Sequence, residues 1–225
     1  MRSIRNMCVL SSALLIFIPF SIVAADAEFD AVAEAGRIYD KWWVELDIRI
    51  PQGTHPSYPK FAKKNGADTW RCKECHGWDY RGNAGAYSQG SHFTGIKGIT
   101  NYAGADITKI VAILKDKRHR YDEMMQEGAL KSVALFVAQG LMDMGKYIDA
   151  KSKQVNGNAL RGKTLFADNC ARCHDNDGRG MNFASGDEVE YIGTLASDNP
   201  WEALHKIRNG HPGAVMRMHR GGVWG

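Results

Sequence analysis

The chain has 225 residues, enough for one large domain or two small ones, and its 24% charged and 10% aromatic residues are typical of a globular protein rather than of a disordered or fibrous one. Its 29 lysines and arginines against 25 acidic residues leave a formal net charge of only +4. A charge so close to neutral argues against nucleic acid or another polyanion as the partner.

The first 25 residues have the pattern of a secretory signal peptide. Two arginines precede a mostly apolar run at residues 9–23, and VAADA supplies small residues for cleavage after Ala25. The alternative is a retained membrane anchor, but the run is short for a membrane span and Pro19 interrupts it. We therefore expect residues 1–25 to be removed and the mature chain to be periplasmic, with no stable membrane span.

Two copies of the order C-x-x-C-H contain every cysteine of the mature chain: Cys72, Cys75, Cys170 and Cys173. Disulfides are one alternative, but a C-x-x-C pair closes a very small ring and neither copy has a thioredoxin-like context. A zinc site is another, and it leaves the adjacent histidines unexplained. C-x-x-C-H is the attachment signature of c-type haem. The motifs therefore predict two covalently bound haem c groups, with the four cysteines as thioether anchors and His76 and His174 as proximal iron ligands.

The second motif carries a family resemblance. GKTLFADNCARCH, residues 162–174, resembles the N-terminal helix and haem motif of class I cytochromes c. Leu165 and Phe166 would give this helix an apolar face for packing against a C-terminal helix and a haem edge. The chain thus looks like a tandem dihaem cytochrome c, with domains at residues 26–155 and 156–225.

The first copy departs from this pattern by a long insertion. AGRIYDKWW, residues 35–43, is similar to the opening helix, but Tyr39 lies 33 positions before Cys72 whereas Phe166 lies 4 before Cys170, which implies an insertion of about 29 residues. IPQGTHPSYPK has three prolines and predicts an extended surface loop. A glycine-rich stretch after His76 is expected to wrap the haem edge as irregular chain. His55 and His92 lie in these loops, where each could bond a haem propionate or face solvent.

Two residues compete as the sixth iron ligand of the first haem. The family resemblance implies methionine, and Met124 follows His119 by the same five positions that separate Met216 from His211. Met124 lies close to the start of an apolar-faced helix predicted at 127–141, and His119 would fit the family's usual gap better. We select Met124 and keep His119 as the alternative.

For the second haem, the resemblance implies Met216 as the sixth ligand. NPWEALHKIRNGHPGAVMRM is similar to the family's helix, glycine–proline turn and ligand methionine, and Met216 lies 42 residues after His174. The alternatives are Met218, His211 and His205, whereas Met181 lies too close to its motif to reach the opposite haem face.

The sequence thus predicts an all-α fold with two cytochrome c-like haem domains, the first with a long loop insertion and the second without an evident C-terminal helix. Only nine residues follow Met216, so we expect either a longer parent chain or an opening helix covered by a partner or by the first domain.

The expected function is electron transfer between a dehydrogenase or quinol-oxidising complex and a terminal reductase or oxidase, with redox proteins as partners and no catalytic side chain. The alternatives are a haem enzyme similar to thiosulfate dehydrogenases or dihaem peroxidases, or a fixed electron-transfer subunit of a larger complex. Thiosulfate dehydrogenases use a distal cysteine, and no mature cysteine is free here.

Overall fold

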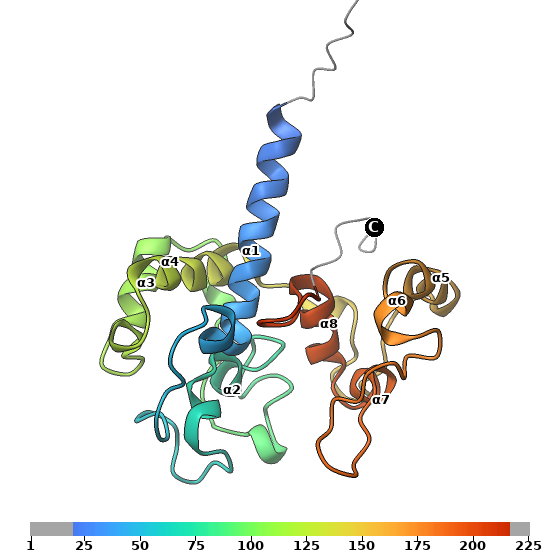
Figure 1. Ribbon diagram of the computed structural model, residues 1–225. Helices are drawn as coiled ribbons and strands as arrows, with labels where there is room; N and C mark the ends of the chain where they lie inside the picture. Colours follow the sequence, from blue (N-terminus) through green and yellow to red (C-terminus); the bar gives the residue numbers. More distant parts are fainter. Residues whose placement is uncertain (1–19, 217–225) are drawn as a thin grey trace, which may run out of the picture.

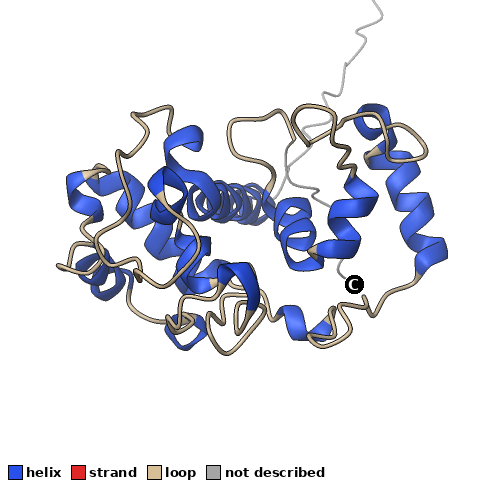
Figure 2. Cartoon of the chain, turned by 90° about the horizontal axis from the view of Figure 1, so that it is seen from below, coloured by secondary structure: helices blue, strands red, loops and turns tan. Residues whose placement is uncertain are grey.

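The computed structural model describes residues 20–216, with side chains from Asp26 onward. Within this part the chain forms helices joined by irregular segments and no β-strand, only two isolated bridges (Figure 2). The prediction of an all-α fold is confirmed for these residues. The α-helices are α1 (Phe20–Glu45), α2 (Cys72–His76), α3 (Ile107–Leu114), α4 (Glu127–Leu135), α5 (Ala159–Asn169), α6 (Ala171–His174), α7 (Ile192–Asp198) and α8 (Pro200–Asn209).

Helix α1 is the longest element and supplies one wall of the core. Ala35, Ile38, Tyr39 and Trp42 recur at helical spacing and are all buried, so the predicted opening helix at 35–43 lies within α1. The helix is interrupted at Lys41, whose backbone is non-helical.

Only the end of the predicted signal peptide lies within the described residues. Residues 1–19 lie outside the described part, and α1 begins at Phe20 and runs through the predicted cleavage point at Ala25. Among the described helices, none has both the length and the apolar character needed to cross a membrane.

Helix α4 packs across α1 and also contacts α3 (Figure 1). The apolar face predicted for residues 127–141 is buried, as Leu130, Val133, Ala134 and Val137 show. The last turn is a π-helix, η5 (Phe136–Gly140), which also packs on α1. A side chain at Gly140 would collide with the ring of Phe136, so glycine allows this close approach.

The predicted insertion is an irregular segment with a fixed internal structure. Its end is a 3₁₀ turn, η1 (Gly66–Trp70), that leads directly into α2. The backbone N–H of Gly66 donates to Thr54 Oγ1 at 2.9 Å, and the Trp70 indole N–H donates to the Gly53 carbonyl at 3.1 Å. Side-chain hydrogen bonds therefore close the insertion on itself despite its three prolines.

The second half of the chain contributes α5 to α8, and only α8 has several fully buried side chains. Figure 1 shows α5, α6 and α7 to one side, with α8 between them and α1. Asn199 caps α8 by accepting from the Glu202 N–H, and Gly210 follows its end with a positive φ of 91°. Pro200, Trp201, His205 and Asn209 are buried, and α8 packs on α1.

Candidate functional site

The first C-x-x-C-H motif forms α2 and opens onto a cavity of about 870 Å³. This volume lies toward the upper end of the range for small-molecule and cofactor sites. Cys72, Cys75 and His76 line the cavity together with α1, α3, α4 and the glycine-rich segment. Its apolar lining consists mainly of Tyr39, Ile96, Ile99, Tyr102, Ile110, Ile113, Leu114, Tyr121, Val133 and Val137.

His76 presents one ring nitrogen for metal binding. Its Nδ1 lies 2.8 Å from the carbonyl oxygen of Lys97, and because a carbonyl can only accept, Nδ1 carries the proton. Burial lowers the pKa of His76 to about 4, so the ring is neutral and Nε2 keeps its lone pair. A hydrogen bond at the far nitrogen is the usual arrangement for a histidine that binds a metal.

His119 lies close to His76 and lines the same cavity. The two ring centres are 6.3 Å apart and the ring planes differ by 28°. A histidine nitrogen lies about 2 Å from the metal it binds, with its ring centre about 1 Å farther back, so two histidines on one iron have ring centres roughly 6 Å apart. His119 Nδ1 lies 3.1 Å from Asp116 Oδ1, which again leaves Nε2 for a metal. The residues of this cavity therefore fit a haem with two histidine ligands.

Met124, the residue selected from the sequence, does not line the cavity. It follows the 3₁₀ turn η4 (Tyr121–Glu123) and packs partly buried against the core, and Met125 is fully inside the core. The geometry thus favours the alternative, His119, over Met124. The turn before His119 and the short turn after it bring the histidine, rather than the methionine, to the cavity.

The four motif cysteines are free in this structure. Burial raises the pKa of Cys72 and of Cys75 to about 12, so both are thiols rather than reactive thiolates. In the described part of the chain, no three His, Cys, Asp or Glu side chains converge as a metal-ion cluster.

The two loop histidines both contact other segments of the chain. His55 is buried, lines the cavity and contacts the carbonyl oxygen of His119 through Nε2 at 3.0 Å. His92 is partly buried, and its Nδ1 lies 3.0 Å from Glu74 Oε2. Neither contact was predicted, because each joins segments far apart in the sequence.

The second motif, Cys170 to His174, spans the end of α5 and α6. His174 is buried, and its Nδ1 has no hydrogen-bond partner in the described chain. Helix α5 has no fully buried side chain, and Leu165 and Phe166 are half-buried. Within the described chain, the first half therefore does not cover α5.

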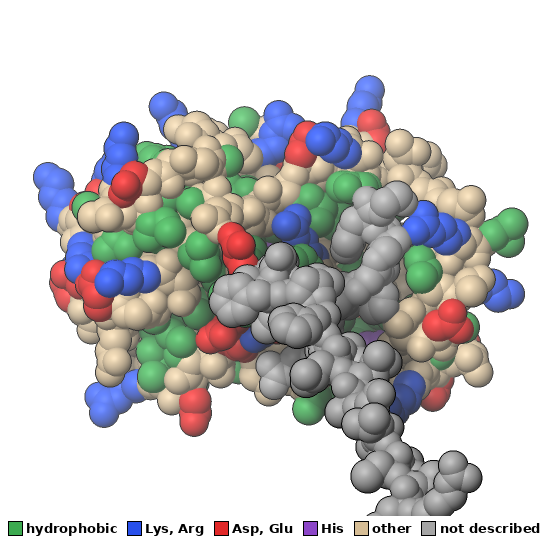
Figure 3. All heavy atoms as spheres, turned by 90° about the horizontal axis from the view of Figure 1, so that it is seen from above, with side chains coloured by type: hydrophobic (Ala, Val, Ile, Leu, Met, Phe, Trp, Pro, Cys, Tyr) green, Lys and Arg blue, Asp and Glu red, His purple; other side chains and the backbone are tan. Residues whose placement is uncertain are grey.

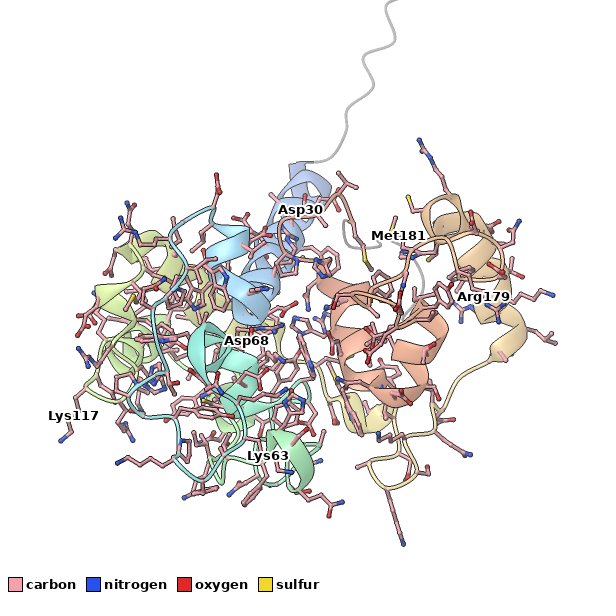
Figure 4. The ribbon with its side chains drawn as sticks, turned by 60° about the horizontal axis from the view of Figure 1, so that its bottom comes forward. Asp30, Lys63, Asp68, Lys117, Arg179 and Met181 are labelled. Carbon is pink, nitrogen blue, oxygen red and sulfur yellow. The ribbon has the colours of Figure 1, made fainter. Side chains whose placement is uncertain are left out.

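The residues predicted as sixth ligands of a second haem have different surroundings. Met216 is half-buried, and its carbonyl oxygen accepts from the His211 N–H at 3.2 Å. Met181 is 42% exposed on the second half of the chain (Figure 4), and Met218 lies outside the described residues. His205 is completely buried, and its two ring nitrogens are hydrogen-bonded to Tyr80 and to the Gly36 carbonyl in the first half of the chain, so it has no nitrogen left for iron.

Charged side chains of both signs are mixed on one face of the molecule (Figure 3). On the face shown in Figure 3, basic and acidic groups alternate between patches of hydrophobic side chains. No large block of one charge is visible on this face, in agreement with the nearly balanced composition.

Comparison with known proteins supports a cytochrome c. Residues 159–220 match the cytochrome c family model. The chain is also 29% identical over 157 residues to the cbb3-type cytochrome c oxidase subunit CcoP of Cereibacter sphaeroides, an alignment that covers 68% of this chain and 53% of the relative. No solved structure matches.

The two comparisons differ in how much of the chain they cover. The alignment with the oxidase subunit is longer than the segment from residue 159 to the end, so it also includes part of the first half. The chain spans about half the length of this relative. Together the matches support a haem protein with covalently bound haem c that transfers electrons.

Proposed function

We propose that the protein is a periplasmic dihaem cytochrome c that carries electrons between a dehydrogenase or quinol-oxidising complex and a terminal reductase or oxidase. The observation that carries the proposal is the cavity beside α2, which His76 and His119 line with ring centres 6.3 Å apart, together with Cys72 and Cys75. The second motif repeats the same attachment residues, Cys170, Cys173 and His174, within the segment that matches the family model.

Each residue of the first site has a defined role in this proposal. Cys72 and Cys75 would hold the haem covalently, and His76 and His119 would be the ligands of its iron. Haem iron supplies reversible one-electron oxidation and reduction. The Lys97 carbonyl and Asp116 hold the proton on Nδ1 of the two histidines, which orients each Nε2 toward the cavity. The apolar lining would limit the access of water to the haem, and solvent access is one determinant of a haem's redox potential.

Two histidine ligands favour an electron carrier over an enzyme at the first haem. A haem peroxidase needs an open iron position, and His119 would occupy it. For the second haem we propose His174 with Met216, the methionine implied by the family resemblance. Because a methionine ligand raises the haem potential, the first haem should have the lower potential of the two.

A second candidate function is a fixed electron-transfer subunit of a larger complex. The observation that favours it is the similarity to a subunit of a cytochrome c oxidase. Purification from membranes solubilised in mild detergent separates the two functions: a fixed subunit co-purifies with oxidase subunits at constant ratio, whereas a carrier elutes alone.

Substitution of His119 and Met124 tests the ligand assignment in the haem-loaded protein. We expect His119→Ala to convert one of the two haems from low-spin to high-spin, because its iron loses a ligand, while Met124→Ala leaves both low-spin. Absorption and electron paramagnetic resonance spectra report the change. The opposite result, with high-spin haem in Met124→Ala only, would restore methionine as the ligand.

A further inference from the structure

The insertion between α1 and α2 contacts the turn that carries His119, and His55 makes that contact. The Nε2 of His55 lies 3.0 Å from the carbonyl oxygen of His119, so Nε2 carries the proton and donates it. Its Nδ1 accepts from the Ser57 backbone N–H at 3.1 Å. Both ring nitrogens are engaged, and together these contacts fix the tautomer of His55.

His55 is itself held rigidly within the insertion. Its backbone N–H donates to Thr69 Oγ1 at 2.8 Å, and that hydroxyl donates to the Gly66 carbonyl at 2.6 Å. Its ring packs edge-to-face on Trp70, with ring centres 4.3 Å apart. Because these contacts already restrict His55, its hydrogen bond to the His119 carbonyl costs little additional conformational entropy of the His55 side chain.

The turn of His119 is held from two directions. On one side Asp116 Oδ1 accepts from the His119 N–H at 3.1 Å and contacts Nδ1 of the ring. On the other side, His55 is the partner of the His119 carbonyl within the described chain. The next residue, Arg120, has a left-handed backbone with φ of 54°, so the chain turns sharply just after His119.

We propose that His55 is a positioning residue for the sixth ligand of the first haem: its hydrogen bond to the His119 carbonyl holds the imidazole of His119 toward His76. The proposal rests on the assignment of His119 as that ligand. It gives the insertion an internal role, namely to keep His119 on the iron.

Carbon monoxide binding to the reduced, haem-loaded protein tests this role, because the gas binds the first haem only when His119 leaves the iron. His55→Phe keeps an aromatic ring but removes the donor, and we expect the binding rate to rise roughly fivefold, the factor that corresponds to about 1 kcal/mol for one lost hydrogen bond. His55→Gln places an amide N–H near the position of Nε2, and its rate should stay within about twofold of the wild type.

Which of these two variants binds carbon monoxide faster shows whether His55 acts through its hydrogen bond or only through the packing of its ring. If His55 acts only as a space-filling ring, phenylalanine should preserve the wild-type rate and glutamine should raise it, and that outcome would overturn the proposal. Circular dichroism confirms that both variants are folded. His92→Phe is the matched control, since His92 lies on another loop and does not line the cavity, and its rate should equal that of the wild type.

His119→Ala separates this proposal from the ligand assignment. Fast binding in His119→Ala with wild-type behaviour in His55→Phe would reject the role of His55 alone. Slow binding in His119→Ala would reject His119 as the ligand, and with it the proposed function of His55.

Discussion

At the scale of single residues, the partner of the second ring nitrogen decides what each buried histidine can do. His76, His55 and His205 each donate to a backbone carbonyl, those of Lys97, His119 and Gly36. His76 keeps its other nitrogen for metal, whereas His55 and His205 use both nitrogens in hydrogen bonds. These hydrogen bonds suit three different roles: His76 is a proposed metal ligand, His55 is a proposed positioning residue, and His205 links buried segments of the core.

The buried His205 should make the stability of the protein depend on pH. Burial lowers its pKa to about 4, with Asp40, Glu202 and Lys206 as the charged groups nearby, so the folded state keeps it neutral. An unfolded histidine takes up a proton near pH 6.5, and the stabilisation present above that pH is lost as pH falls toward 4, by about 3 kcal/mol at most.

Urea unfolding of the wild type and His205→Gln between pH 7 and pH 4 measures this effect. The variant removes the titrating group, so its free energy of unfolding should fall less steeply over this range than that of the wild type. Parallel curves for the two proteins would show that His205 does not contribute to the pH dependence.

The sequence predicted those residues of the candidate site that belong to one short motif. The C-x-x-C-H motif specifies its two cysteines and histidine within five residues, and α2 has these residues at the cavity. The choice between His119 and Met124 depends on a tight turn and the left-handed Arg120, which spacing alone does not reveal. Asp116, three residues before His119, is a sequence signal that could have favoured the histidine.

At the scale of elements, the contact between α8 and α1 joins the two halves of the chain. Arg37 donates to the Asn209 carbonyl at 2.8 Å and pairs with Glu45, and His205 bonds both Tyr80 and the Gly36 carbonyl. Gly36 allows this approach, because an added Cβ would lie 2.5 Å from Asn209 Cγ. The interface is therefore tightly fitted as well as hydrogen-bonded.

Replacement of Gly36 by alanine should loosen α8 from α1. Overpacking at such a site destabilises by about 1–3 kcal/mol, and the midpoint of urea unfolding should fall accordingly. The matched control is Gly128→Ala in α4, where an added Cβ meets nothing within 4 Å, so its stability should stay the same or rise by up to about 1 kcal/mol. Equal stability of the two variants would contradict the close fit between α1 and α8.

Two helices were predicted from the sequence, but their packing partners were not. The apolar spacing predicted a helix at 127–141 and the family resemblance implied an opening helix at 35–43, and both lie within helical segments of the structure, α4 with η5 and α1. The π-helical end of the second helix and the docking of α8 on α1 depend on contacts with distant residues, for which a local pattern carries no signal.

At the scale of the whole molecule, the two halves are buried to different degrees. The first has a continuous aromatic and aliphatic core around its cavity, whereas α5 in the second has no fully buried side chain. Because α5 is poorly covered, we predict that a haem at the second motif is held less stably than a haem at the first. A cytochrome c match over residues 159–220 nevertheless shows that this half has the family's sequence pattern.

Intact-mass spectrometry of the exported protein tests the central claim, that one chain binds two covalent haems, most directly. We predict two haem additions on a chain that lacks residues 1–25, and a single addition on a variant with Cys170 and Cys173 both replaced by alanine. A wild-type chain with one haem, or with haem that acid and organic solvent extract, would contradict the account.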